Sequence, residues 1–260
     1  MNKAPKNLRM SLSEECQKIL DDQLVMFKDD DWACSYMETH KYRIFDDAEM
    51  VAKFSGGKNI LNIGGAPYLL EAALSAQRFE TTTIDLDASR HEKQIKEMGI
   101  NVQSLDVESS QFEKFELAGF DLILMCEVFE HLRQDLLATM SRISSGMSPN
   151  SLLLLTTPNF FYKPVLMERL LENRSGPPPV KEWGKLRGLG HMGHVREYSL
   201  VELVEIFSAT GFAVKYLEGR NSRGVSDTEI NFSNPKSIWQ FEAQISPLAA
   251  QEFVFLLARE

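Results

Sequence analysis

Short apolar runs alternate with helix-like stretches along most of the chain after residue 58. The runs that we expect to form buried strands cover residues 59–63, 81–84, 101–105, 120–125 and 151–156. Apolar residues recur at helical spacing between these runs, at 68–76, 90–98 and 134–144. Strands that alternate with helices in this way predict a parallel, doubly wound α/β sheet with right-handed crossovers.

Residues 161–196 interrupt this alternation. They hold five of the fifteen glycines, a run of three prolines at 177–179, and seven Lys/Arg against three Asp/Glu. A loop-rich, locally basic insertion after a core strand is typical of the substrate region of an α/β protein. The alternation then resumes with a helix at 199–210 and strands at 212–217 and 252–258.

The first fifty residues are acidic and predict a helical cap. Ten Asp/Glu stand against four Lys/Arg between residues 14 and 47, and apolar residues recur there at near-helical spacing. Aromatic residues cluster in the second half of this segment, at Trp32, Tyr36, Tyr42 and Phe45. We expect the segment to pack on the core, with an aromatic lid over a ligand as the alternative.

Composition and charge narrow the function classes. With 260 residues, 43% of them hydrophobic and 25% charged, the chain is typical of a globular protein, which excludes the disordered and collagen-like classes. A formal net charge of −9 argues against broad binding to nucleic acid or to an anionic membrane. The three cysteines are scattered, and neither a signal peptide nor a membrane-spanning run is visible. We therefore expect a cytoplasmic protein.

The residues that directly follow the predicted strands are the first candidates for a binding site, because ligands of doubly wound sheets bind at the carboxyl ends of the strands. A turn of small residues after the first strand lets a ligand approach the backbone and a helix N-terminus. Asp85 follows that turn by about twenty residues and can accept both hydroxyls of a ribose. Asp106 can accept a hydrogen bond from an adenine amine. Together these residues predict an adenosine site.

The wider series of segments is more specific than the turn, which reads GGAPYL and lacks the second and third glycines of the NAD dehydrogenase pattern. The series reads NILNIGGAPY at 59–68, TID at 83–85, LDV at 105–107, FDLILMCEVFEHL at 120–132, LTTPN at 155–159, HVREYSLVEL at 194–203 and ATGF at 209–212. In this order the segments resemble the class I S-adenosylmethionine-dependent methyltransferases, in particular the group with an E-V-x-E-H-L segment after strand four.

The resemblance implies a Rossmann-like fold whose seven-stranded, mostly parallel sheet has an antiparallel last strand. It implies an N-terminal helical cap at 1–50 and a methyltransferase domain at 51–260, with the insertion at 161–196 after strand five. S-adenosylmethionine is the implied cofactor and S-adenosylhomocysteine the product. The implied cofactor-binding residues are Gly64, Gly65, Ala66, Tyr68, Asp85, Asp106, Val107 and Glu127.

Within that set, the small residues of the turn would line the methionine end, Asp85 would hold the ribose diol, and Asp106 would accept from the adenine amine. The turn departs from the family pattern, with Asn62 in place of the usual acid and Ala66 and Tyr68 in place of glycines. Tyr68 is therefore either a core aromatic or a residue over the methionine. These departures keep one alternative open, a cofactor-binding pseudo-enzyme that acts as a partner subunit.

Methyl transfer from a sulfonium is an in-line displacement, so positioning provides most of the catalysis. A hydroxyl acceptor also needs a base, and histidine is the natural base near pH 7. His191 and His194 lie in the glycine-rich insertion beside the expected pocket, so one of them is the first candidate. His131 is the next, with a structural role as its alternative. His91, in a charged helical stretch, is expected to face solvent, and His40 is the most remote candidate.

A metal-dependent reaction is the main alternative. Glu127, Glu130, His131 and His194 resemble, in type and order, the ligand set of small-RNA 3′-terminal 2′-O-methyltransferases. Such ligands suit a hard or borderline divalent ion. Metal-free relatives carry the same letters, and an RNA substrate fits poorly with a net charge of −9. The sequence therefore favours a site without a metal.

The function that we expect from the sequence is methyl transfer to an oxygen of a small metabolite, such as a sugar, a nucleotide sugar, a carboxylate or a secondary metabolite. The insertion carries a net charge of +4 from Phe161 to Arg196, which indicates an anionic acceptor. Neither a membrane nor a nucleic acid is an expected partner. A homodimer is compatible with the sequence.

Overall fold

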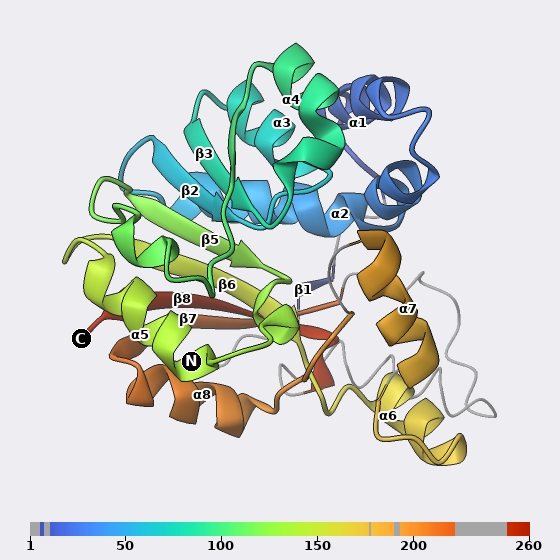
Figure 1. The fold of residues 1–260 in the computed structure, drawn as a ribbon, viewed down its shortest axis with the longest axis vertical. Coiled ribbons are helices and arrows are strands. Elements are labelled where there is room, and N and C mark those ends of the chain that lie inside the picture. The colour runs from blue at the N-terminus through green and yellow to red at the C-terminus, as the bar shows by residue number, and fades with distance from the viewer. Residues whose placement is uncertain (1–5, 8–10, 177, 190–192, 222–248) are drawn as a thin grey trace.

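A computed structural model describes residues 6–7, 11–176, 178–189, 193–221 and 249–260 of the chain. These residues form one eight-stranded sheet with the strand order β1-β7-β8-β6-β5-β2-β3-β4 (Figure 1). The strands are β1 (Lys6–Asn7), β2 (Asn59–Ile63), β3 (Glu80–Asp85), β4 (Asn101–Ser104), β5 (Leu122–Cys126), β6 (Leu152–Pro158), β7 (Phe212–Asn221) and β8 (Glu252–Arg259). Strand β8 runs antiparallel to both β6 and β7, and the remaining pairs are parallel.

The seven strands β2 to β8 confirm the predicted Rossmann-like methyltransferase sheet, including its antiparallel last strand. The eighth strand was not predicted. It has only two residues, Lys6 and Asn7, which pair with Arg220 and Asn221 of β7. Two residues carry no periodicity, so an edge strand of this length leaves no signal in the hydrophobic pattern.

Helices cover both faces of the sheet. They are α1 (Glu14–Met26), α2 (Asp31–Phe54), α3 (Leu69–Ala76), α4 (Glu92–Met98), α5 (Leu136–Gly146), α6 (Lys163–Leu171), α7 (Pro179–Leu189) and α8 (Leu200–Ala209). Helices α1, α2 and α3 share one hydrophobic cluster with the sheet, and α5 and α8 share a second cluster on the opposite face. None of the helices in the described part of the chain is long and apolar enough to cross a membrane.

The N-terminal helices are a layer of the core as well as a cap. Leu20 of α1 and Met37 of α2 are fully buried in the same cluster as Ile60 and Leu124 of the sheet. Burial of a side chain of this size stabilises a fold by about 1.5–3 kcal/mol. Helix α2 continues to Phe54, so the expected boundary at residue 50 lies inside a helix.

A cluster of buried charged side chains joins α2 to strands β7 and β8. Arg220 of β7 is fully buried, and its guanidinium lies 3.1 Å from Asp46, 2.7 Å from Asp47 and 2.8 Å from Glu252 of β8. Arg43, one turn before Asp47, is 3.9 Å from that carboxylate. Buried charges persist only when they are paired, so the cluster holds α2 in a defined register over the sheet.

The insertion contains two helices, α6 and α7, where the glycines and prolines predicted loops. Pro164 lies in the first turn of α6, and α7 begins at Pro179. A proline is well tolerated at the start of a helix because the N–H that it lacks has no partner there. Helix α6 lies at the edge of the molecule (Figure 1) and buries none of its residues, whereas α7 buries Glu182.

Candidate active site

A cavity of about 440 Å³ opens at the carboxyl ends of β2, β3 and β5, beneath α2. Its volume falls within the range of about 300–1,000 Å³ typical of small-molecule sites. The structure brings six of the eight predicted cofactor-binding residues to this cavity: Gly64, Ala66, Asp85, Asp106, Val107 and Glu127. Glu130, His131, His194 and His40, from the candidate base and metal sets, line it as well. Gly65 and Tyr68 are not among the lining residues, and His191 lies outside the described part of the chain.

The turn after β2 requires its two glycines. Gly64 has a φ of +79°, and a Cβ on it would lie 2.5 Å from Cγ2 of Val128. A Cβ on Gly65 would lie 2.2 Å from Oε1 of Glu71. No L-side chain fits either position without displacing a neighbour, so the turn requires glycine at both.

Asp85 closes this turn from the neighbouring strand. Its Oδ2 accepts hydrogen bonds from the backbone N–H groups of Gly65 and Ala66, both at 3.0 Å. Its second oxygen makes no hydrogen bond to any described residue. Asp85 therefore both shapes the turn and keeps an acceptor for a ligand hydroxyl.

Both carboxylate oxygens of Asp106, the residue predicted to accept from the adenine amine, already contact neighbouring residues. Its Oδ1 accepts from the N–H of Glu108 at 2.9 Å, and its Oδ2 lies 2.5 Å from Nη2 of Arg133. Glu108 in turn accepts from the N–H groups of Arg133 and Gln134. Arg133 and Glu108 also line the cavity, and sequence reasoning missed both because their pairing joins segments 25 residues apart.

Tyr68 and His91 are packed together behind the turn. Tyr68 is fully buried with a φ of +68°, and its ring meets the ring of His91 edge-on at 5.9 Å. The expectation that His91 faces solvent is wrong: its side chain is buried, stacks on Trp32, and places Nε2 3.1 Å from Asp30. A short 3-10 helix at Ala88–His91 turns the ring inward against the start of α2.

Helix α2 supplies one wall of the cavity. Trp32, Tyr36, His40 and Arg43 follow one another at about one helical turn and all line it. Arg43 is 4% exposed, donates from Nη2 to the hydroxyl of Tyr36 at 2.9 Å, and has no partner for Nε among the described residues. Helix α2, which belongs to the acidic N-terminal segment, therefore places a buried cation at the cavity. The excess of Asp and Glu in this segment gave no indication of that cation.

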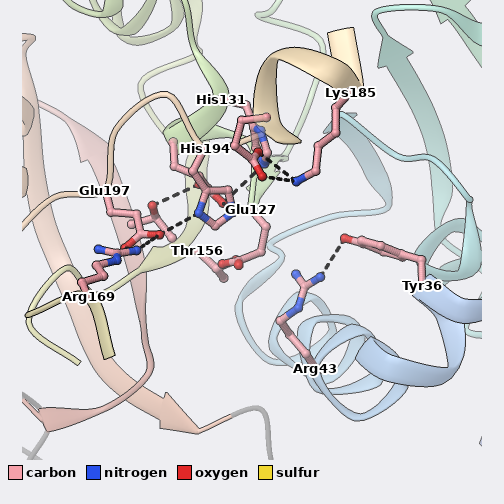
Figure 2. Close-up of polar contacts among 12 residues, drawn as sticks. Tyr36, Arg43, Glu127, His131, Thr156, Arg169, Lys185, His194 and Glu197 are labelled. Carbon is pink, nitrogen blue, oxygen red and sulfur yellow. Dashed lines mark hydrogen bonds and ion pairs between the residues drawn. The ribbon is translucent and has the colours of Figure 1, made fainter. Parts of the chain in front are cut away.

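Two glutamates and two histidines gather at the opposite wall. Oε1 of the buried Glu130 lies 3.8 Å from Nε2 of both His131 and His194. One possible ligand atom from each of these three residues lies within 4.8 Å of the others. Glu127, which has a φ of +57°, accepts from Thr156 at 3.3 Å. In Figure 2 the Glu127 carboxylate lies between His194 and Arg43.

Burial and neighbouring charges shift the pKa values of the glutamates and of His194 in this cluster. Burial, together with the neighbouring Glu130, raises the pKa of Glu127 to about 7. Burial likewise raises the pKa of Glu130. Burial alone would lower the pKa of His194, but its hydrogen bond to Glu197 and the charge of Glu130 raise that pKa above 6.5. Shifted titratable groups in a cavity are typical of catalytic sites.

Glu197 and Arg169, which sequence reasoning did not single out, position the ring of His194. Its Nδ1 lies 2.8 Å from Oε1 of Glu197, and both Glu197 oxygens accept from Nη2 of Arg169 at 2.8 Å. Although burial alone would raise the pKa of Glu197, the bonds from His194 and Arg169 hold it below its ordinary value. The sequence signal for Glu197 is the H-V-R-E segment, in which it follows His194 by three residues.

The comparisons with known proteins agree with this geometry. A family model described as a methyltransferase domain matches residues 36–217, which is most of the chain. None of the curated proteins is similar enough to match. The matched range begins at Tyr36 of α2 and ends in β7, so it includes all the residues that line the cavity except Trp32.

Solved structures with the same fold are methyltransferases of low identity. A Burkholderia thailandensis 1,6-didemethyltoxoflavin N1-methyltransferase with bound S-adenosylhomocysteine is 14% identical, with a TM-score of 0.54 over 98% of this chain and 93% of that one. The mitomycin 7-O-methyltransferase MmcR is 15% identical, with a TM-score of 0.51 over 95% and 67%. A putative methyltransferase studied in complex with the Haloferax volcanii Trm112 activator is 14% identical, with a TM-score of 0.59 over 92% and 97%. The chain belongs to this methyltransferase-domain family and is a class I S-adenosylmethionine-dependent methyltransferase.

Proposed function

We propose that this methyltransferase transfers the methyl group to an oxygen of a small anionic metabolite, with His194 as the general base. The observation that carries the proposal is the position of His194. It lines the same cavity as the Gly64 turn and Asp85, and Glu197 holds its Nδ1 so that Nε2 is on the cavity side.

The residues of the cavity fit the cofactor. When bound, S-adenosylmethionine supplies an electrophilic methyl group on a sulfonium. The turn at Gly64 leaves backbone open to a ligand, and Asp85 retains one carboxylate oxygen for a ribose hydroxyl. Asp106 and Val107 lie at the expected adenine end. The buried guanidinium of Arg43 is suited to a carboxylate at the other end.

His194 would accept the proton of the acceptor hydroxyl while the protein holds that hydroxyl in line with the methyl group. General-base catalysis of this kind contributes about 10²–10⁴-fold to a rate. Glu197 would stabilise the imidazolium that forms. A neutral amine and a carboxylate oxygen have no need of such a base, so dependence on His194 identifies a hydroxyl acceptor. This matters because the similar structures include an N1- and a 7-O-methyltransferase.

Cations at the rim support an anionic acceptor. Lys185 of α7 lines the cavity and is paired with Glu182 at 2.8 Å. The insertion that carries Lys185 has a net charge of +4 in a chain of net charge −9. A local positive region of this kind raises the encounter rate with an anion.

The test is a screen of sugar, nucleotide-sugar and carboxylate acceptors for formation of S-adenosylhomocysteine, with the methylated atom assigned by NMR. The wild-type chain and the variants His194→Gln and Glu205→Gln, the latter at an exposed position of α8, are compared on the best acceptor. Methylation of an oxygen, with a loss of about 10²-fold or more in His194→Gln only, supports the proposal. Methylation of a nitrogen, or full activity in His194→Gln, overturns it.

A metal-dependent reaction is the second candidate, and one observation favours it. Oε1 of Glu130 is buried without a hydrogen bond among the described residues, and it faces Nε2 of both His131 and His194. Oxygen and imidazole ligands suit a divalent ion that could bind two hydroxyls of an acceptor. Calorimetric titration with Mn²⁺ tests this candidate. Binding that is lost in His131→Gln and kept in Glu205→Gln, at an exposed position of α8, supports it, and the absence of binding excludes it.

A further inference from the structure

His194 lies between two cavities. Its Nε2 is on the side of the main cavity, 3.8 Å from Glu130, and its Nδ1 is bonded to Glu197 on the side of a second cavity of about 220 Å³. The second cavity is lined by Phe160, Arg169 and Glu197. Figure 2 shows Arg169, Glu197 and His194 as one continuous chain of contacts. His194 is therefore linked to helix α6 through Glu197 and Arg169.

The chemistry of this chain determines which ring nitrogen of His194 carries the hydrogen. Nη2 of Arg169 donates to both oxygens of Glu197, and an arginine is always charged, so Glu197 is a carboxylate with acceptors only. The bond of 2.8 Å to Nδ1 then requires a hydrogen on Nδ1. In the neutral ring the lone pair belongs to Nε2, on the side of the main cavity.

We propose that Glu197 is a positioning residue that fixes the Nδ1–H tautomer of His194, and that Arg169 holds Glu197 in place from helix α6. The catalytic meaning of the tautomer rests on the proposed function, because only a base with its lone pair on the acceptor side can take the proton. The tautomer itself depends only on the contacts among Arg169, Glu197 and His194, and can be tested without reference to the reaction.

The ion pair between Arg169 and Glu197 is largely buried, unlike an ordinary surface ion pair. The side chains of Arg169 and Glu197 are 11% and 10% exposed, and the guanidinium lies 5.7 Å from the ring of Phe160. Helix α6 buries none of its residues, so this ion pair is a principal attachment of the helix to the site. Movement of the insertion is thereby coupled to the orientation of the base.

Nitrogen NMR of the full chain tests the proposal without an acceptor. The chain is labelled with ¹⁵N-histidine and studied with S-adenosylhomocysteine and EDTA at alkaline pH, where imidazole rings are neutral. The chain has five histidines, so single His→Gln variants assign every ring. Long-range ¹H–¹⁵N couplings then show which nitrogen of His194 is protonated. We expect the Nδ1–H form in the wild type, and a mixture or the Nε2–H form in Glu197→Ala and Arg169→Met.

Two results would overturn the proposal: an Nε2–H ring in the wild type, or an Nδ1–H ring that persists in Glu197→Ala. Glu205→Ala, at an exposed position of α8, is the matched control and should leave the spectrum unchanged. Glu197→Asp should restore part of the Nδ1–H form. The affinity for S-adenosylhomocysteine should stay within about two-fold of wild type in all variants. If His194→Gln is fully active while the tautomer changes as expected, the positioning role stands and the base assignment alone fails.

Discussion

Arg133 and Asp106 form an ion pair of 2.5 Å at the wall of the cavity. The side chains are 29% and 26% exposed, so the pair is close to solvent and open to competition. Asp106 is the residue that the resemblance assigns to the adenine amine. An adenine at this position therefore has to share or displace the contact with Arg133.

Replacement of Arg133 by Gln should tighten cofactor binding. The change frees one oxygen of Asp106, and partly exposed pairs of this kind are worth about 0.2–1 kcal/mol, so we expect a gain of up to about five-fold in affinity for S-adenosylhomocysteine. Calorimetry measures it, with Arg133→Lys as the control that keeps the charge. Weaker binding in Arg133→Gln would show that Arg133 itself holds the cofactor.

The rate of methyl transfer should fall in acid because His194 must be neutral to accept a proton. Its hydrogen bond to Glu197 and the charge of Glu130 outweigh burial and raise its pKa above 6.5. We therefore expect kcat to decrease as the pH falls through a value above 6.5, with a plateau on the alkaline side. A pH profile in EDTA checks this. An acid limb centred below 6.5 would contradict the assigned environment of the ring.

Glu71 should make the fold less stable at neutral pH than in mild acid. Its buried carboxyl accepts from Asn62 and Thr83, both at 2.7 Å, and burial raises its pKa from 4.5 to about 7. A carboxyl with a raised folded pKa stabilises the fold below its unfolded pKa, and that contribution is lost as the pH rises through the folded pKa. The free energy of unfolding should therefore decrease between about pH 4.5 and 7.

The variant Glu71→Gln keeps both hydrogen bonds and removes this titration. It should exceed the wild type in free energy of unfolding by about 3 kcal/mol at neutral pH, and match it near pH 4. Urea unfolding of both proteins across this range is the measurement. Parallel curves with a constant difference would rule out the buried carboxyl as the cause.

Arg220→Met should strongly destabilise the protein. It leaves Asp46, Asp47 and Glu252 buried without their shared cation, and loss of one partner of a buried ion pair costs about 3–5 kcal/mol. Lys215→Met, at an exposed position of the same strand, should change the free energy of unfolding by less than about 0.5 kcal/mol. Equal effects of the two variants in urea unfolding would contradict the role given to the cluster.

Much of the sheet could be predicted because each long strand has its own apolar run and a defined end. Asp85 and Asp106 line the cavity for the same reason, since a residue that ends a parallel strand lies at the ligand edge of the sheet. The cavity also brings together His131 and His194, which lie 63 positions apart in the chain. The base assignment stays a prediction for His131, His191 and His194 alike.

The remaining features depend on tertiary contacts that leave no local pattern. Arg43 belongs to an acidic helix, and only its position on the inner face of α2 brings a cation into the cavity. His91 stands among charged residues, yet a short 3-10 helix buries it. The pairing of Arg169 with Glu197 joins the insertion to the segment before α8, and neither residue alone predicts the other.

Calorimetric titration of the dialysed protein with S-adenosylhomocysteine, with and without EDTA, tests the central claim most directly. We predict micromolar or tighter binding that EDTA does not change, and a loss of about 10²-fold or more in Asp85→Ala, because that carboxylate holds the turn and is the proposed acceptor for the ribose. Asp87→Ala, at an exposed position, should bind as the wild type does. A folded protein that does not bind, or an Asp85→Ala variant with unchanged affinity, would contradict the account and favour a partner subunit without a working cofactor site.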